Sequence, residues 1–229
     1  EAESLCRNIA ILDKGYLGGG GSARSTAIIR ANYLTPQGIP FFYESVKMYE
    51  NLAQELNYNL LFSQMGRLDL GHTESAIYTL RMRAEFNRAL GVPSWIVGPK
   101  QVKEMAPAID LRENKDLPIL GALYHPPSGV IRHDAVVWGY AKNVDKMGVE
   151  LHPFTEVTGI KRSSGKVVGV ETNKGFIKTD LVLNATAGWT STICKMVDLD
   201  IPIVTHPLQA FVTEPIKPLM GASVSSANL

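Results

Sequence analysis

The chain has few cysteines, and this scarcity excludes two kinds of protein. Only two of its 229 residues are cysteine, Cys6 and Cys194, and neither belongs to a CxxC pair. The sequence therefore argues against a disulfide scaffold and against a thiolate zinc site, and it fits a reducing cytoplasm. The histidines show no metal-ligand spacing with an acid or a cysteine, so we expect no metal site.

The chain also lacks a charge excess and a long apolar run. It carries 23 basic and 22 acidic residues, a formal net charge of +1, so no bulk field favours nucleic acid or an anionic membrane. No apolar run approaches the ~20 residues of a membrane span, and no signal-peptide pattern is present. With 45% hydrophobic and 20% charged residues, the composition is that of a globular protein of one large domain or two small ones.

The stretch Ile9–Tyr33 has the order of a nucleotide-binding segment. Its apolar run Ile9–Leu12 predicts a buried parallel strand, and Asp13 follows directly. A carboxylate at the end of the second strand of a dinucleotide-binding fold accepts hydrogen bonds from a ribose diol. The glycines Gly18–Gly21 let the backbone approach a ligand and turn N–H groups toward phosphate oxygens. The alternative is a flexible glycine loop after an ordinary strand, and the order of strand, acid, glycines and small polar residues favours a cofactor loop.

A dinucleotide-binding unit needs a first strand and a GxGxxG turn before the strand that leads to Asp13, and neither precedes it. The chain opens on Glu1 rather than methionine, in what we interpret as a helix tail over residues 1–7, and it stops in small polar residues at 221–229. We therefore expect a fragment truncated at both ends.

Apolar periodicity and turn residues predict the remaining elements. Helices are expected over 36–56, 75–90, 99–105, 135–147 and 190–197. Strands are expected over 121–125, 148–157, 181–183 and 203–214, with a bent strand pair over 60–70. Two short strands with turns at 163–165 and 173–175 predict a β-meander inserted in a parallel sheet. On the second helix, a solvated outer face is expected for Arg81, Arg83, Glu85 and Arg88.

Two polar residues have two possible roles each. Arg30 follows two apolar residues and is suited either to bidentate binding of a substrate carboxylate or to a structural ion pair. His133 and Asp134 stand at the expected start of the fourth helix, where Asp134 is a natural cap. A helix N-terminus disfavours a positive charge, and the neutral imidazole is the nucleophilic form. The alternative for His133 is a second capping residue or a packed ring.

Several ordered segments carry a resemblance to a known family. They include LDKGYLGGG, ARSTAIIRANY, LNYNLLFSQMGRLDLGHT, LGALYHPPSGVIRHDAVVWGYA and HPLQAFVTE. With them the chain resembles the sarcosine oxidase beta subunits, within the D-amino-acid-oxidase-like family of FAD-dependent amine oxidoreductases. The resemblance implies an α/β fold with α+β insertions: a Rossmann-like FAD-binding domain with a β-meander, plus part of a mixed-sheet substrate domain. The implied segments are 1–34 and 128–200 for FAD binding, and 35–127 and 201–229 for the substrate domain.

The resemblance also implies cofactor residues. Asp13 would bind the adenosine ribose of FAD, and Val157 would contact adenine through its main chain. His133 would carry FMN covalently, although the histidine that often follows it in the family is Ala135 here. The glycine loop departs from the family at Gly21-Ser22. The other implied cofactor residues are Lys14, Gly19, Gly20, Gly21, Arg24, Ser25, Thr26, Ala187 and Gly188.

The implied reaction is the oxidative demethylation of sarcosine to glycine, with Arg30 on the substrate carboxylate. Hydrogen peroxide would form, and folate would capture the one-carbon unit in a cytoplasmic complex with alpha, gamma and delta subunits; the fragment alone would be inactive. One alternative is a related FAD-dependent dimethylglycine or D-amino-acid dehydrogenase without covalent FMN. Another is a nucleotide-binding interaction module without redox activity.

Overall fold

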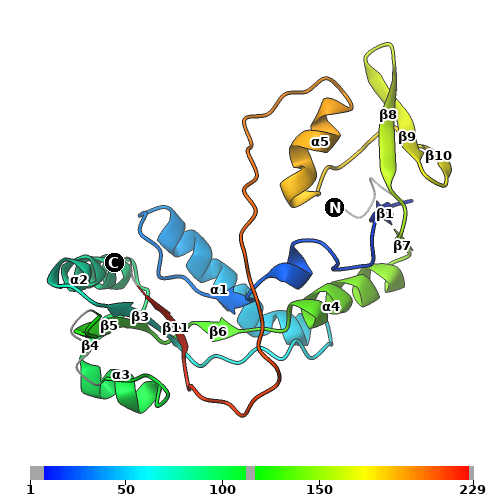
Figure 1. The fold of residues 1–229 in the computed structure, drawn as a ribbon. Coiled ribbons are helices and arrows are strands. Elements are labelled where there is room, and N and C mark those ends of the chain that lie inside the picture. Colours follow the sequence, from blue (N-terminus) through cyan, green and yellow to red (C-terminus); the bar gives the residue numbers. More distant parts are fainter. Residues whose placement is uncertain (1–7, 112–116, 227–229) are drawn as a thin grey trace. The chain divides into compact units, whose positions relative to one another are not determined.

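The structure, a computed structural model, describes residues 8–111 and 117–226 and divides into two compact units (Figure 1). Unit 1 consists of Glu1–Ser25 and Val136–Phe211, and unit 2 consists of Thr26–Ala135 and Val212–Leu229. The expected helix tail and Cys6 lie outside the described residues. None of the helices in the described ranges is long and apolar enough to cross a membrane.

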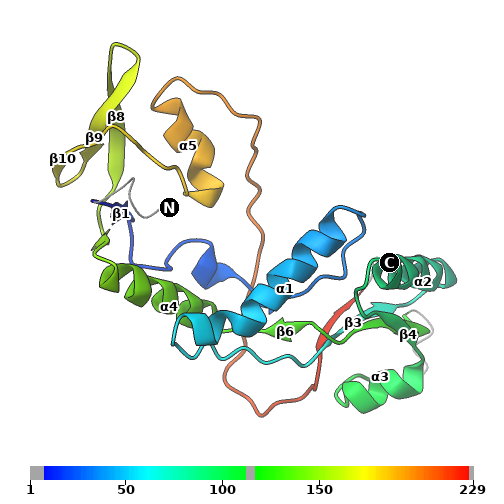
Figure 2. The same cartoon turned by 180° about the vertical axis from the view of Figure 1, so that it is seen from behind.

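Unit 2 is organised around a four-stranded mixed sheet in the order β11-β3-β5-β4. Strand β3 is antiparallel to β5 and parallel to β11. In Figures 1 and 2, helices α2 and α3 lie on opposite sides of this sheet. The bounds are β3 (Arg67–Gly71), β4 (Trp95–Val97), β5 (Gly121–His125), β11 (Ser223–Ser226), α2 (Glu74–Ala89) and α3 (Pro99–Met105).

Each face of this sheet buries its own apolar cluster, because successive side chains of a strand point to opposite faces. On the face toward α3, Leu68 and Leu70 pack with Val102. On the face toward α2, Leu123 packs with Leu80 and other α2 side chains. The side chain of a residue between Leu68 and Leu70 therefore points toward α2.

The rest of unit 2 fixes the segment that follows the glycine loop. Strand β2 (Ile28–Ile29) pairs antiparallel with β6 (Gly129–Val130). Two residues later, Ala31 is fully buried and packs with Ile39 of helix α1 (Gly38–Glu55). The backbone on either side of Arg30 is thus held by a strand and by a core contact.

Unit 1 contains a short parallel pair, a meander and several helical segments. Strands β1 and β7 are parallel, and β8, β9 and β10 form an antiparallel meander, as predicted. Its first turn has positive φ at Ser164 (48°) and Gly165 (77°), the type I′ geometry that matches strand twist. The bounds are β1 (Ala10–Leu12), β7 (Glu150–His152), β8 (Val157–Ser163), β9 (Lys166–Thr172), β10 (Gly175–Lys178), η2 (Ser22–Arg24), η3 (Ala187–Trp189) and α5 (Thr190–Lys195); helix α4 (His133–Lys146) starts in unit 2 and continues in unit 1.

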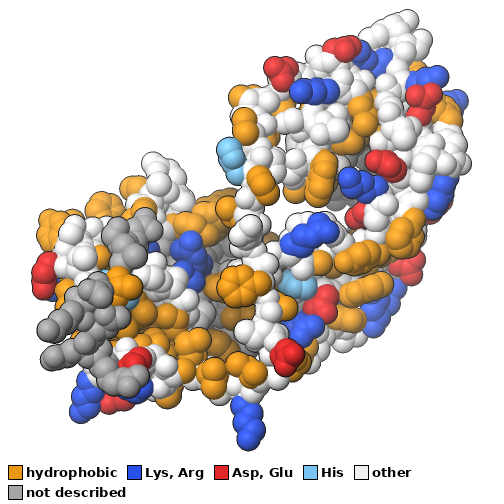
Figure 3. Space-filling model, viewed as in Figure 1, with side chains coloured by type: hydrophobic (Ala, Val, Ile, Leu, Met, Phe, Trp, Pro, Cys, Tyr) orange, Lys and Arg blue, Asp and Glu red, His pale blue; other side chains and the backbone are white. Residues whose placement is uncertain are grey.

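Several predicted strands are wrong. Segments 181–183 and 203–214 form no strand, and Leu183 (88% exposed) and Phe211 (93% exposed) face solvent. Their apolar alternation finds no neighbouring strand among the described residues, and alternation without a partner does not make a ladder. The expected pair over 60–70 reduces to β3 and one isolated bridge from Ser63. Strand β1 forms as predicted, but Ile11 is 42% exposed rather than buried. Hydrophobic side chains are accordingly visible on the surface of both units (Figure 3).

The predicted strand over 148–157 is also too long. It reduces to β7, because Phe154 has a positive φ of 54° and turns the chain before β8. By contrast, both bounds of α3 and of β5 match the prediction.

Candidate functional site

Asp13 follows β1 and is held mainly through its backbone. Its N–H donates to the His152 carbonyl (3.1 Å), and its own carbonyl accepts from the Thr155 N–H (2.8 Å). Its carboxylate oxygen Oδ1 accepts from the Gly15 N–H (2.8 Å). Among the described residues Oδ2 has no hydrogen-bond partner. The backbone of Asp13 is therefore fixed, and one oxygen of its carboxylate is available to a ligand hydroxyl.

The four glycines after Asp13 have different roles. Gly18 has a φ of +86° and packs against Val137, and a Cβ on Gly19 would come within 2.9 Å of the Tyr16 ring. These two glycines are needed for the turn itself. A Cβ on Gly20 or Gly21 would meet no atom within 4 Å. The main chain at Gly20 and Gly21 therefore borders open space that a ligand could fill.

Other expected cofactor residues of unit 1 lie around this loop. The Lys14 ammonium lies 4.7 Å from the centroid of the Trp189 ring, which brings Lys14 next to the segment of Ala187 and Gly188. The Gly188 carbonyl accepts a hydrogen bond from Thr205 Oγ1 (2.9 Å). Val157 begins β8 beside a register shift. Arg24 ends η2 and, like Ser25, is exposed.

His133, Arg30 and Thr26 belong to unit 2. His133 is the first residue of α4, and its ring nitrogen Nδ1 is buried without a hydrogen-bond partner. The predicted N-cap position of Asp134 is wrong, because α4 starts at His133, two residues before the expected Ala135, and Asp134 lies in the first turn. The Asp134 carboxylate accepts a hydrogen bond from the N–H of the next residue, Ala135 (3.0 Å), and two from Arg132 (3.1 and 3.2 Å). The Arg132 guanidinium holds the pKa of Asp134 below its usual range.

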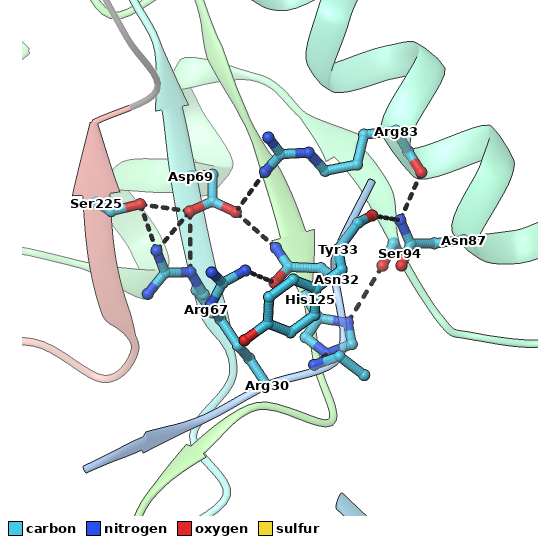
Figure 4. Close-up of polar contacts among 11 residues, drawn as sticks. Arg30, Asn32, Tyr33, Arg67, Asp69, Arg83, Asn87, Ser94, His125 and Ser225 are labelled. Atoms are coloured by element: carbon cyan, nitrogen blue, oxygen red, sulfur yellow. Dashed lines mark hydrogen bonds and ion pairs between the residues drawn. The ribbon is translucent and has the colours of Figure 1, made fainter. Parts of the chain in front are cut away.

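Arg30 lies at the edge of a polar group that we call the Asp69 cluster (Figure 4). Arg30 Nη1 donates to Asn32 Oδ1 (3.0 Å), and Asn32 Nδ2 donates to Asp69 Oδ2 (2.6 Å). The Arg30 guanidinium also lies over the Tyr33 ring, 4.3 Å from its centroid. The cluster is defined as Arg30, Asn32, Arg67, Asp69, Arg83 and Ser225.

Asp69 is the centre of this cluster and is only 3% exposed. Arg67 Nε donates to its Oδ1 (2.9 Å), and Ser225 Oγ donates to the same oxygen. Arg83 Nη1 lies 3.6 Å from Oδ2. Strand geometry explains the arrangement: Arg67 and Asp69 share the α2 face of β3, and Ser225 is the register partner of Asp69 on β11.

The Asp69 cluster carries three guanidinium groups and one carboxylate. Desolvation lowers the pKa of Arg83, and the nearby charges of Arg30 and Arg67 lower it further, whereas Asp69 raises it. A partly buried excess of positive charge is suited to an anion, and guanidinium groups bind carboxylates with good geometry. The cluster can therefore hold the carboxylate of a small molecule.

Sequence reasoning predicted Arg30 and missed the rest of the cluster. The predicted outer-face position of Arg83 is wrong, since its side chain is only 19% exposed and reaches Asp69. The Arg-Leu-Asp-Leu alternation at 67–70 does indicate that Arg67 and Asp69 share a face. No local spacing indicates that Arg83 and Ser225 meet them.

His125 holds the backbone inside the cluster. It is fully buried, and its Nε2 accepts from the N–H of Ala31 (3.1 Å). Its Nδ1 lies 2.9 Å from the Pro93 carbonyl and 3.2 Å from Ser94 Oγ, so Nδ1 carries the proton and donates to Pro93. Burial lowers the pKa of His125 to about 4. The neutral ring thus fixes the peptide between Arg30 and Asn32.

Comparison with known proteins gives this geometry a family context. Residues 2–228 match the family model described as DAO, FAD dependent oxidoreductase. The chain is 39% identical to sarcosine oxidase subunit beta of Arthrobacter sp over 222 residues, which are 97% of this chain and 55% of that protein. It is 41% identical to sarcosine oxidase subunit beta of Rhizobium meliloti (strain 1021) over 218 residues, 95% of this chain and 52% of that protein. The chain thus spans about half the length of the curated relatives it matches.

A solved structure has a similar fold. L-proline dehydrogenase from P. horikoshii superposes with a TM-score of 0.74 and 27% sequence identity, covering 83% of this chain and 49% of that one. The α/β architecture with its meander is therefore of the FAD-binding type found in this family.

Proposed function

We propose, because the chain belongs to the DAO family of FAD-dependent oxidoreductases, that it is part of a flavoprotein that oxidises a carboxylate-bearing N-methyl amine. The substrate we propose is sarcosine, converted to glycine, as the names of the relatives suggest. The observation that carries the substrate class is the positive excess of the Asp69 cluster, with Arg30 at its half-buried edge.

The residues of unit 1 fit FAD. Asp13 keeps Oδ2 available for a ribose hydroxyl, and Gly20 and Gly21 leave open space beside the main chain. When bound, FAD supplies the hydride acceptor, and the protein supplies orientation and electrostatics. We propose that FAD is held by unit 1 residues Asp13, Lys14, Gly19, Gly20, Gly21, Arg24, Ser25, Val157, Ala187 and Gly188, and by Thr26, which follows Ser25 along the chain.

Arg30 would bind the carboxylate of the substrate. Only its Nη1 makes a hydrogen bond among the described residues, so most of its five N–H donors remain for a planar anion. Holding one end of a small amine fixes the position of the other end, and positioning of this kind lowers the entropic barrier of a reaction. The N-methyl group is then the end that reacts.

We further propose that His133 carries FMN covalently. The unpartnered Nδ1 supports this, because a buried polar ring nitrogen without a hydrogen-bond partner among the described residues calls for a functional explanation, and a bond to a flavin would provide one. The complex with alpha, gamma and delta subunits, hydrogen peroxide as product and folate capture of the one-carbon unit complete the proposal.

Substitution of Arg30 tests the substrate class. In the full-length chain purified with its partner subunits, Arg30→Met should raise KM for sarcosine about 100-fold, because loss of a buried charge partner costs about 2–5 kcal/mol. Arg88→Met removes an exposed arginine of α2 that pairs with Glu85 and should leave KM unchanged. An unchanged KM in Arg30→Met would contradict the proposal.

Acid precipitation tests the covalent flavin. FAD should appear in the supernatant, while yellow colour stays in the pellet and disappears in His133→Ala. His152→Ala removes an exposed histidine paired with Glu150 and should keep the colour. A colourless pellet from the assembled wild-type complex would overturn covalent FMN and favour the related dehydrogenase without it.

A further inference from the structure

We propose that Asn32 and Asp69 are positioning residues that hold the Arg30 guanidinium in the orientation that binds the substrate carboxylate. This inference rests on the proposed role of Arg30. According to this inference, the affinity for the substrate carboxylate depends on the series of hydrogen-bonded side chains Arg30–Asn32–Asp69 and not on Arg30 alone.

The chemistry of the contacts fixes the direction of this chain. A guanidinium only donates hydrogen bonds and a carboxylate only accepts them. Asn32 lies between the two and is fully buried, so its Oδ1 must face Arg30 (3.0 Å) and its Nδ2 must face Asp69 (2.6 Å). The amide is thereby locked in one orientation.

The spacer also preserves the charge of Arg30. A direct contact between Arg30 and Asp69 would be an ion pair, and the substrate carboxylate would then compete with a carboxylate of the protein. Asn32 transmits the position of Asp69 without a direct ion pair. The negative charge of Asp69 is neutralised by two other arginines: Arg67 donates a hydrogen bond to it at 2.9 Å, and Arg83 lies 3.6 Å from it.

Asp69 is a fixed reference point for this chain. It lies in β3 between two paired strands, and Ser225 on β11 donates to it. At the other end of the chain of contacts, the Arg30 guanidinium lies over the Tyr33 ring. That ring stacks on the Phe42 ring, with 3.9 Å between the two centroids. A guanidinium held at one nitrogen and across one face keeps its remaining N–H edge in a defined direction, which is the requirement for bidentate binding of a carboxylate.

The test compares two substrates that differ only at the carboxyl end, which is an anion in one and a neutral amide in the other. In the full-length chain with its partner subunits, kcat/KM is measured for N-methylglycine and for its neutral amide, N-methylglycinamide. Asn32→Ala should lower the preference for the carboxylate substrate about tenfold, the value of one charge-assisted hydrogen bond. Val102→Ala, which removes buried volume on the other face of the unit 2 sheet, should affect both substrates alike. An equal loss for both substrates in Asn32→Ala would mean a structural role and overturn the inference.

A double-mutant cycle separates this inference from the proposed function. Once Arg30 is Met, Asn32→Ala should cause no further loss of preference, because the residue that it positions is gone. If Arg30→Met alone leaves the preference unchanged, the proposed function fails. If Arg30→Met removes the preference and Asn32→Ala does not lower it, only the positioning role fails.

A second variant keeps the inference testable if Asn32→Ala does not fold. Asp69→Asn removes a negative charge near Arg30, so electrostatics alone predicts tighter binding of the carboxylate. A positioning role of Asp69 predicts weaker binding of the carboxylate, because the charged carboxylate that holds Arg67 and Asn32 in place is lost. A rise in the preference for N-methylglycine in Asp69→Asn would overturn the inference, and a fall would support it.

Discussion

Asp13 in unit 1 and Asp69 in unit 2 are both candidate site carboxylates, yet their surroundings differ in kind. Asp13 is half-buried, takes one hydrogen bond from a backbone N–H two residues away, and keeps Oδ2 without a partner among the described residues. Asp69 is 3% exposed and contacts four side chains from β3, β11, α2 and the segment after β2. The first is arranged to contact a ligand directly, whereas the second acts through its neighbours.

Removal of each carboxylate in turn should test the difference between the two sites most clearly. Asp69→Ala leaves Arg67 and Arg83 largely buried without their counter-charge, and loss of one partner of a buried pair costs about 3–5 kcal/mol. The free energy of unfolding of the full-length chain, measured in urea, should fall by this amount. Asp13→Ala should cost less than about 1 kcal/mol and should instead release FAD. Equal losses of stability would show that the two sites are not different in kind.

The difference between the two sites also explains what could be predicted from the sequence. The site of unit 1 follows from local order: a short strand, an acid, then glycines, all within 9–26. The Asp69 cluster joins residues 30, 32, 67, 69, 83 and 225. Its members meet only because β3 pairs with β11 and because α2 covers one face of the sheet. One sequence does not specify such pairings, because strand register depends on the whole fold.

The errors in the predicted elements have the same origin. The hairpin turns and the helix that begins at Pro99 depend on local chemistry, and these predictions are confirmed. The strands predicted over 181–183 and 203–214 needed a partner strand, which local alternation cannot provide. The sequence groups Arg83 with the charged residues Arg81, Glu85 and Arg88 on one solvated face of α2. Those three residues are exposed, whereas the Arg83 side chain reaches across to Asp69 on the sheet.

Substitution of His125, which is buried in unit 2, tests the difference between the two sites through the pH dependence of stability. Its folded pKa of about 4 lies below the ~6.5 of an unfolded chain. As the pH falls from about 6.5 to about 4, the unfolded state takes up a proton that the folded state does not, so stability decreases in this window by about 3 kcal/mol. Urea unfolding at several pH values should show that His125→Gln lacks this part of the loss. A control, His152→Gln, alters an exposed histidine of unit 1 and should keep the wild-type slope. A wild-type slope in His125→Gln would contradict the neutral, buried role of this ring.

A methyl group on the glycine loop tests the open character of unit 1. Gly21 has φ −60° and ψ −31°, and its added Cβ would meet no atom within 4 Å. Gly21→Ala should therefore fold normally, with stability unchanged or raised by about 0.5 kcal/mol. If FAD occupies the open space, its affinity should fall about tenfold, because only glycine permits close approach. Gly98→Ala offers the same open space and an allowed φ of −80° in unit 2 and should leave FAD binding unchanged. Unaltered FAD binding in Gly21→Ala would place the cofactor elsewhere.

The smallest effect should come from Lys14, whose ammonium lies 4.7 Å from the Trp189 ring centroid. Both side chains are exposed, and a cation–π pair at such a site contributes about 0.5–1 kcal/mol. Lys14→Met keeps the aliphatic stem and should lower the free energy of unfolding by about 0.5 kcal/mol, whereas Lys166→Met, which alters an exposed lysine of the meander, should change nothing. Bound FAD should enlarge the difference, because Lys14 would then also face a phosphate charge, and added salt should reduce it again through screening. A difference that does not respond to FAD or to salt would make Lys14 a packing residue of unit 1 and leave the phosphate to backbone N–H groups.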